Sequence, residues 1–112
     1  MKILSGQYKG LSILTSKNIS YRPTQTRIRK SIFDILRPFE YSKVLDLYSG
    51  SGILGFESAS RGAESITFVE SDYFAIQMLI KNKNNFKNSN ILITRKKVEV
   101  FLKNNKQSYD LI

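Results

Sequence analysis

The chain has 112 residues and carries 18 Lys and Arg against 9 Asp and Glu, which gives a formal net charge of +9. This length is enough for one domain with a single core. Neither cysteine nor histidine occurs in the sequence, which excludes disulfides, thiolate metal sites and an imidazole general base. Catalysis would therefore depend on carboxylates, backbone groups or a cofactor, and we expect no metal site.

The positive charge, with an isoelectric point near 9.9, favours nucleic acid as a partner. A second explanation stays open, because the chain is rich in Lys, Asn and Ile, the residues that AT-rich codons favour. The opening MKILSGQYKG is too short in apolar residues for a secretory signal, and no run of about 20 apolar residues occurs. We expect a cytoplasmic protein without membrane contact.

Residues 2–15 alternate apolar and polar positions around two glycines, which predicts two short strands and a turn. A loop over residues 16–24 separates this hairpin from a helix that is predicted to begin at Thr24 or Thr26 and to end near Leu36. The apolar face predicted for this helix consists of Ile28, Ile32, Ile35 and Leu36.

From Lys43 onward, predicted strands and helices alternate. VLDLY, ESITFVE, NILIT and SYDLI predict strands, and ILGFESASRG, DYFAIQMLIKNKNNF and KKVEVFLKNN predict helices. Gly62 is placed to end the first of these helices and Asp72 to cap the second. The alternation predicts a parallel sheet with right-handed crossovers. The chain is thus expected to divide into a hairpin, loop and basic helix (residues 1–42) and a cofactor-binding half-domain (residues 43–112).

The stretch DLYSGSGILG, which starts at Asp46, joins the first of these strands to a helix through G-x-G-x-x-G, formed by Gly50, Gly52 and Gly55. Such a turn places backbone N–H groups and a helix N-terminus at a bound cofactor. Glu70 ends the next strand, where a carboxylate accepts hydrogen bonds from both ribose hydroxyls of a nucleoside. The pattern therefore predicts a nucleoside-containing cofactor.

Asp46 favours S-adenosylmethionine over a nicotinamide dinucleotide. Its carboxylate would repel a pyrophosphate but would pair with the positive amino group of S-adenosylmethionine, which carries no phosphate. Ser49 and Ser51 also replace the apolar V-x-G opening that is typical of nicotinamide folds. A dinucleotide remains an alternative. In a third interpretation, Asp46 only caps the following helix and the glycines only turn the chain.

Four segments of the sequence follow one another in a recognisable order and spacing: ILSGQYKG, YRPTQTRIRKSIFDIL, VLDLYSGSGILGFESASRGA and ITFVESD. In these segments the sequence resembles the bacterial 16S rRNA guanine-N2 methyltransferases of the RsmD type. The similarity covers at least residues 3–80, and methyltransferases in general share neither the R-P-T segment at Arg22 nor the hairpin before it. The resemblance implies an α/β, Rossmann-like class I methyltransferase fold with an N-terminal β-hairpin and helix. It also implies S-adenosyl-L-methionine as methyl donor, and 16S rRNA or the assembling small ribosomal subunit as partner.

Two sets of candidate residues follow from the motifs and the resemblance. The cofactor set is Asp46, Tyr48, Gly50, Ser51, Gly52, Glu70 and Ser71. The RNA set, which lies beside Tyr21 at the start of the first helix, is Arg22, Thr24, Arg27, Arg29 and Lys30. A solvated helix face is the alternative interpretation of the second set.

The sequence departs from the family pattern in two places. After the third strand, Lys96 and Lys97 stand where the family has a glycine–aspartate pair near the adenine, and Glu99 follows two residues late. In this family the fourth strand, begun here by YDLI, leads into an Asp-Pro-Pro-aromatic motif that holds the target amino group and stacks on the flipped base. That motif is not reached by Ile112, so we expect a sheet truncated after the start of the fourth strand.

Two functional hypotheses remain at this point. In the first, the chain is the cofactor-binding half of an rRNA methyltransferase that acts on guanine N2, with its catalytic residues expected just after Ile112. In the second, the 112-residue product is an inactive fragment that binds RNA weakly.

Overall fold

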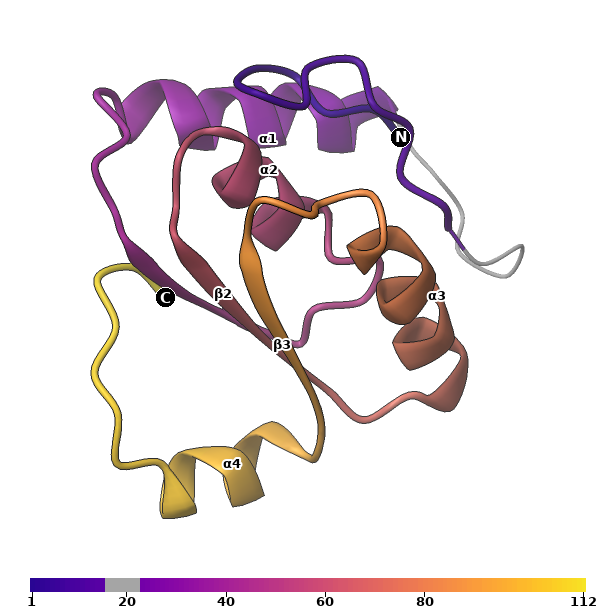
Figure 1. Ribbon diagram of the computed structural model, residues 1–112, viewed down its shortest axis with the longest axis vertical. Helices are drawn as coiled ribbons and strands as arrows, with labels where there is room; N and C mark the ends of the chain where they lie inside the picture. The colour runs from indigo at the N-terminus through magenta and orange to yellow at the C-terminus, as the bar shows by residue number, and fades with distance from the viewer. Residues whose placement is uncertain (16–22) are drawn as a thin grey trace.

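The computed structural model describes residues 1–15 and 23–112, with only the backbone described for residues 23–25. A parallel sheet lies at its centre, with the spatial order β1 (Lys43–Leu47), β2 (Ser65–Glu70), β3 (Asn90–Arg95) (Figure 1). The helices are α1 (Pro23–Ile35), α2 (Ile53–Ser60), α3 (Tyr73–Lys83) and α4 (Val98–Asn104). The predicted alternation of strands and helices and the parallel sheet are confirmed.

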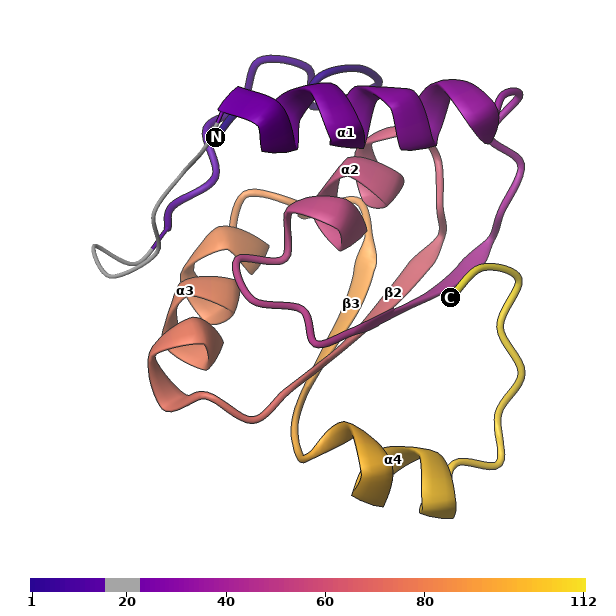
Figure 2. The ribbon, with the colours of Figure 1, turned by 180° about the vertical axis from the view of Figure 1, so that it is seen from behind.

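Figure 2 shows α2 and α3 on one side of the sheet and α4 on the other, and each face of the sheet contributes to its own apolar cluster. Val44, Ile66 and Ile91 lie opposite one another on the three strands and pack with the side chains of α2 and α3. On the other face, Leu45 and Val69 pack with α4 through Val98 and Phe101. Alternate strand residues thus meet different helices, as the period of a strand requires.

Of the predicted fourth strand, the structure contains the first residues, which pair with β1. Leu111 forms a parallel bridge with Val44, and its carbonyl accepts a hydrogen bond from the Leu45 N–H at 2.9 Å. The Asp110 carboxylate accepts from the N–H groups of Ser42 and Lys43 at 3.1 and 2.8 Å. The sheet therefore extends on the β1 side, away from β3.

The N-terminal segment is less regular than predicted. Residues 2–15 form one antiparallel bridge, between Lys2 and Ser12, and not two strands. Further hydrogen bonds come from α3, where the buried side chain of Asn82 bonds both the N–H and the carbonyl of Leu14, at 2.9 and 3.0 Å. Residues 11–13 bond to residues 1–3 through their backbones, and at Leu14 the amide side chain makes the bonds that a neighbouring strand would make.

The apolar face predicted for α1 is wrong. Ile28 and Ile35 are 59% and 81% exposed, whereas Arg29 and Phe33 are 3% and 2% exposed. Phe33 faces α2, where the guanidinium of Arg61 lies 4.6 Å from the centroid of its ring. Periodicity predicts an amphipathic helix correctly but does not determine which of its faces meets a partner.

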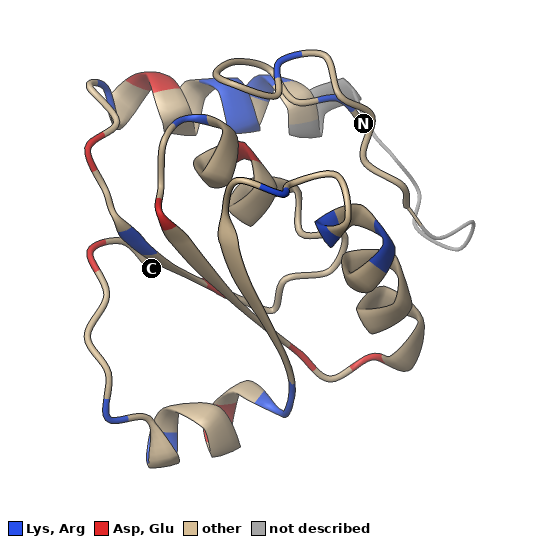
Figure 3. Cartoon of the chain, viewed as in Figure 1, with Lys and Arg blue, Asp and Glu red and all other residues tan. Residues whose placement is uncertain are grey.

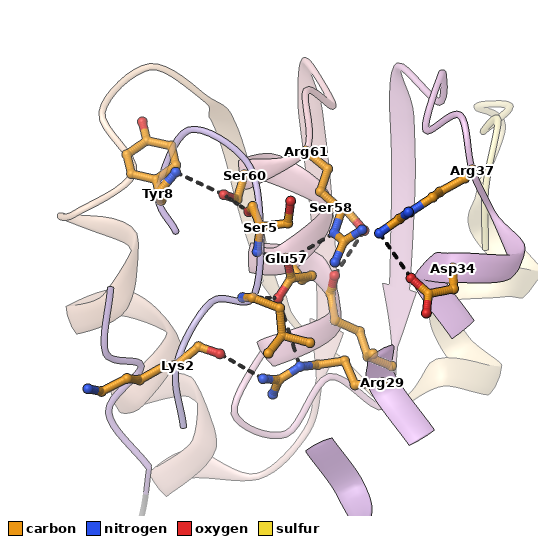
Figure 4. A network of polar contacts seen from close by, with 12 residues as sticks. Lys2, Ser5, Tyr8, Arg29, Asp34, Arg37, Glu57, Ser58, Ser60 and Arg61 are labelled. Carbon is orange, nitrogen blue, oxygen red and sulfur yellow. Dashed lines mark hydrogen bonds and ion pairs between the residues drawn. The ribbon is translucent and has the colours of Figure 1, made fainter. Parts of the chain in front are cut away.

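A buried carboxylate joins α1, α2 and the N-terminal segment (Figure 4). Glu57 of α2 accepts hydrogen bonds from the N–H groups of Leu4 and Ser5 at 2.8 and 3.1 Å, and from Arg61 Nε at 2.9 Å. Arg29 Nε lies 3.8 Å from the Oε1 atom of Glu57 in a second ion pair. These partners replace the water that the fully buried carboxylate has lost.

Replacing Glu57 by Gln should lower the free energy of unfolding by about 3 kcal/mol, because two guanidinium groups would then face a neutral amide in the protein interior. Asp34→Asn is the matched control. Asp34 also pairs with two cations, Lys30 at 2.9 Å and Arg37 at 3.2 Å, but at the surface, where ion pairs contribute little. Urea unfolding followed by circular dichroism measures both variants. Equal losses would contradict the role assigned to Glu57.

Candidate cofactor site

The chain leaves β1 through a loop with left-handed backbone. The φ angles of Tyr48, Gly50 and Gly52 are 54°, 57° and 80°. Ser49 ties this loop to β2, since its hydroxyl donates to the Asp46 carbonyl at 2.6 Å and accepts from the Val69 N–H at 3.1 Å. The loop is thereby held at the carboxyl edge of the sheet, where open α/β sheets bind their ligands.

The glycines of this loop have different roles. A Cβ at Gly52 would overlap Leu79, and a Cβ at Gly55 would overlap the Phe68 ring. At Gly50, no atom lies within 4 Å of the position that a Cβ would take. Gly52 and Gly55 therefore let α2 approach the core closely, whereas Gly50 leaves open space in front of the loop.

Glu70 closes the loop from the end of β2. Its Oε1 accepts a hydrogen bond from the Gly50 N–H at 2.8 Å, and its Oε2 accepts from the N–H groups of Ser71 and Asp72 at 2.9 and 2.8 Å. Asp72 caps α3 as predicted, by accepting from the Ala75 N–H at 2.8 Å. These donors orient the Glu70 carboxylate. They use both lone pairs of Oε2 and leave one lone pair of Oε1 for a ligand.

A cavity of about 350 Å³ opens beside Glu70, at the carboxyl ends of β2 and β3. The Tyr48 hydroxyl donates to Glu99 Oε1 at 3.3 Å, and the negative charge of Glu99 raises the pKa of Tyr48. Two carboxylates with apolar side chains between them suit a nucleoside, which carries N–H and O–H donors around a flat base. The lining residues are Tyr48, Val69, Glu70, Ser71, Lys96, Lys97, Val98 and Glu99.

Asp46 lies on the other side of the glycine loop, where it lines a second cavity of about 370 Å³ between β1, α1 and α2. Its Oδ2 accepts a hydrogen bond from the Gly55 N–H at 3.1 Å. Burial raises the pKa of the Asp46 carboxyl to about 7; the Gly55 hydrogen bond opposes this shift and the charge of Glu70 adds to it. A cation placed beside Asp46 would favour its ionised form.

The predicted cofactor residues gather around one loop but not in one cavity. Tyr48, Glu70 and Ser71 line the cavity at β2 and β3, and Asp46 lines the cavity at β1. Ser51 is buried, and Gly52 is the N-cap of α2. Their part in binding a cofactor stays a prediction.

Sequence reasoning did not select the apolar walls of the first cavity, Val69 and Val98. The position of Val69 directly before Glu70 was a signal for the first of them. Glu99 lines this cavity together with Lys96 and Lys97, so an acid is present although the expected position holds a lysine.

Among the predicted RNA residues whose side chains the structure describes, Arg27 and Lys30 are exposed and Arg29 is buried. Arg22 lies outside the described residues, as does the side chain of Thr24. Arg27 and Lys30 are exposed on α1, and Lys30 forms an ion pair with Asp34. Figure 3 shows that Lys and Arg are also spread over α3 and the connection from β3 to α4.

The assignment of Arg29 to RNA binding is wrong. Its guanidinium is buried between α1 and α2, pairs with Glu57 and donates to the Lys2 carbonyl at 2.7 Å. A side chain in this position is not available to a phosphate. The alternative interpretation, a solvated helix face, is also wrong for Arg29, because this side chain is buried.

Within residues 1–15 and 23–112, no three carboxylate side chains come together as a metal-binding group. None of the helices in the same ranges has the length and apolar character needed to cross a bilayer.

The parallel sheet, the glycine loop at its carboxyl edge and the acid that ends β2 are features of a Rossmann-like fold. The family model Cons_hypoth95, described as Conserved hypothetical protein 95, matches residues 1–112. The chain belongs to this family, and the resemblance to the RsmD type is confirmed.

Named relatives agree with this family. Ribosomal RNA small subunit methyltransferase D of Buchnera aphidicola subsp. Baizongia pistaciae is 36% identical over 100% of this chain and 58% of its own length. The protein of the same name from Escherichia coli K12 is 34% identical over 91% of this chain and 52% of its own length. The chain spans about half the length of the curated relatives it matches.

A solved structure supports the fold. The Escherichia coli methyltransferase candidate yhhF superposes with a TM-score of 0.80 at 31% identity, over 91% of this chain and 55% of that chain. The expected Rossmann-like methyltransferase fold, ending here with the start of a fourth strand, is confirmed.

Asp46→Asn should stabilise the empty protein at about pH 8 but not at about pH 4. Folding raises the pKa of Asp46 from 3.8 to about 7, so the wild type loses stability as the pH rises between these values, and the loss is complete above them. Asparagine keeps an acceptor for the Gly55 N–H and has no charge to bury. Because Asp46 retains some contact with solvent, we expect a gain of roughly 1–2 kcal/mol.

Urea unfolding at both pH values measures this difference. Asp34→Asn is the control. Its effect on stability should have the opposite pH dependence, because the hydrogen bond from Lys30 lowers the pKa of the Asp34 carboxyl. A gain from Asp46→Asn that is equal at both pH values would show that the raised pKa is not its cause.

Proposed function

We propose that this chain binds S-adenosyl-L-methionine and forms the cofactor-binding part of a methyltransferase that modifies a guanine N2 of 16S rRNA. The observation that carries the proposal is the desolvated Asp46 carboxyl beside a glycine loop with open space at Gly50. The substrate is supported by relatives that are named small-subunit rRNA methyltransferases.

The charges of the site favour S-adenosylmethionine over a dinucleotide. When bound, S-adenosylmethionine supplies an electrophilic methyl group on a positive sulfonium. Asp46, whose anion is destabilised by burial, gains from a nearby cation, whereas a pyrophosphate would be repelled by Asp46 and Glu70 together. Lys96 and Lys97 are cations that would attract a phosphate, so NAD is the appropriate comparison ligand.

The lining residues of the first cavity suit the adenosine part of the donor. Glu70 would accept a hydrogen bond from a ribose hydroxyl through Oε1, and Val69 and Val98 would flank the adenine. Glu99 would accept from the exocyclic amino group in place of the acid that the family carries earlier, with Tyr48 holding Glu99 by its hydroxyl. The methionine part would then extend past Gly50 towards Asp46.

Isothermal titration calorimetry should show that the chain binds S-adenosylmethionine or its demethylated product, with no measurable binding of NAD. Asp46→Asn and Glu70→Gln should each weaken binding by roughly 1–3 kcal/mol, because each removes a charge-assisted interaction. Wild-type affinity should rise from about pH 6 to about pH 8, since the cation binds the ionised carboxyl, and this rise should vanish in Asp46→Asn.

Glu64→Gln is the control, because Glu64 is an exposed acid that hydrogen-bonds Ser42 on the opposite edge of the sheet. It should bind as the wild type does. Tighter binding of NAD than of S-adenosylmethionine would overturn the proposed cofactor.

Methyl transfer to an exocyclic amine also needs an acceptor for the amine proton. Asp110 lies at the wrong edge of the sheet for this role, since its carboxylate accepts from Ser42 and Lys43 at the start of β1. The described acids at the carboxyl edge have other roles: Asp72 caps α3, and the remaining three are the groups proposed to hold the cofactor, Asp46, Glu70 and Glu99. We assign the amine-holding groups to the family segment that continues the strand begun at Leu111.

The 112-residue chain alone should therefore give no methylation of small ribosomal subunits from a tritiated methyl donor. A chimera that continues after Ile112 with the remaining part of the Buchnera relative should restore labelling, and Glu70→Gln in that chimera should reduce it by about 10- to 100-fold, the cost of a lost charge-assisted hydrogen bond. Robust labelling by the chain alone would place the acceptor site within these residues.

A further inference from the structure

Two aromatic rings are exposed side by side at the start of α3. Tyr73 and Phe74 are 51% and 64% exposed, with ring centroids 5.5 Å apart and ring planes at 81°. Neither ring lines the cavity beside Glu70 or the cavity beside Asp46. Their exposure is therefore not explained by the proposed cofactor site, and adjacent exposed rings are a common feature of interaction surfaces.

Consecutive cations lie next to these rings. Arg95 ends β3, and its guanidinium lies 5.4 Å from the centroid of the Tyr73 ring. Lys96 and Lys97 follow, both exposed, where the chain turns from β3 into α4 (Figure 3). Glu99 is the acid nearest to these cations in sequence and shares the cavity beside Glu70 with Lys96 and Lys97. The ion pairs of the described residues include none of the three cations, which keeps their charge available to a ligand.

The topology keeps this surface on the outer side of the sheet. β3 is the edge strand of the described sheet, and the bridge from Leu111 to Val44 adds the next strand beyond β1. Chain that continues the sheet in the longer relatives is thus added on the side opposite to Tyr73 and Arg95. The rings and cations therefore lie at the β3 end of the strand order, away from that extension.

We propose that Tyr73, Phe74, Arg95 and Lys96 form an aromatic–cationic strip that binds unpaired RNA next to the cofactor site. Bases would stack on the two rings, and the cations would pair with phosphates between them. Lys96 also lines the cavity beside Glu70, so the strip leads directly to the proposed methyl donor. This inference rests on the proposed rRNA substrate and names the part of the chain that holds it.

Fluorescence anisotropy with a labelled single-stranded oligouridine, measured over a range of salt concentrations, tests the strip. Tyr73→Ala with Phe74→Ala should weaken binding by about tenfold without changing the salt slope, because stacking involves no counterion release. Arg95→Gln should reduce the salt slope by about one. Phe74→Leu, which keeps apolar volume but removes the ring, should lose affinity as Phe74→Ala does.

Ile80→Ala on the exposed part of α3 and Lys87→Gln after it are the matched controls, and both should bind as the wild type does. If the wild type binds RNA and the strip variants match the controls, the strip is overturned and the proposed substrate stands. If the wild type binds no RNA, the strip and the rRNA substrate fall together. Normal RNA affinity with lost binding to assembled subunits would assign the strip to a protein partner and overturn it as an RNA site.

Discussion

The arrangement of the described chain depends on a carboxylate that has no solvent around it. A buried charge costs several kcal/mol unless it is paired and hydrogen-bonded. Glu57 meets this condition only where the N–H groups of Leu4 and Ser5 and the guanidinium groups of Arg29 and Arg61 converge. The N-terminal segment, α1 and α2 must therefore assemble in one geometry, and the pairing determines their arrangement more than it adds stability.

That geometry reaches the cofactor loop through α2. The C-terminal half of this helix is held by Glu57 and by Ser60, whose hydroxyl bonds the Ser5 carbonyl at 2.6 Å. Its N-terminal half receives the glycine loop and donates the Gly55 N–H to Asp46. The charge at one end is compensated within the protein, whereas the carboxyl at the other end keeps a pKa raised to about 7. A cationic ligand would provide the compensating positive charge at Asp46 that the two arginines provide at Glu57.

Local signals in the sequence predict the elements of the fold and the loop of the site. The glycine turn after β1, the cap at Asp72 and the acid at Glu70 each depend on residues close in the chain, so one sequence is enough to find them. Arg29 could not be placed in this way, because its burial depends on Glu57 in the next helix. The same holds for the strand predicted near Leu14, whose partner is the side chain of Asn82 in α3.

The face of α1 that the sequence predicts to be buried is apolar but does not pack on α2. Ile32 and Leu36 line the cavity of about 370 Å³ together with Leu54 of α2 and Leu111, on the side of β1 where the sheet extends. The helix thus has two apolar faces, one that packs on α2 through Phe33 and one that borders the cavity beside β1. The relatives are about twice as long as this chain, and the amphipathic pattern of α1 is consistent with a second packing surface. Periodicity alone does not determine which of the two faces packs on α2.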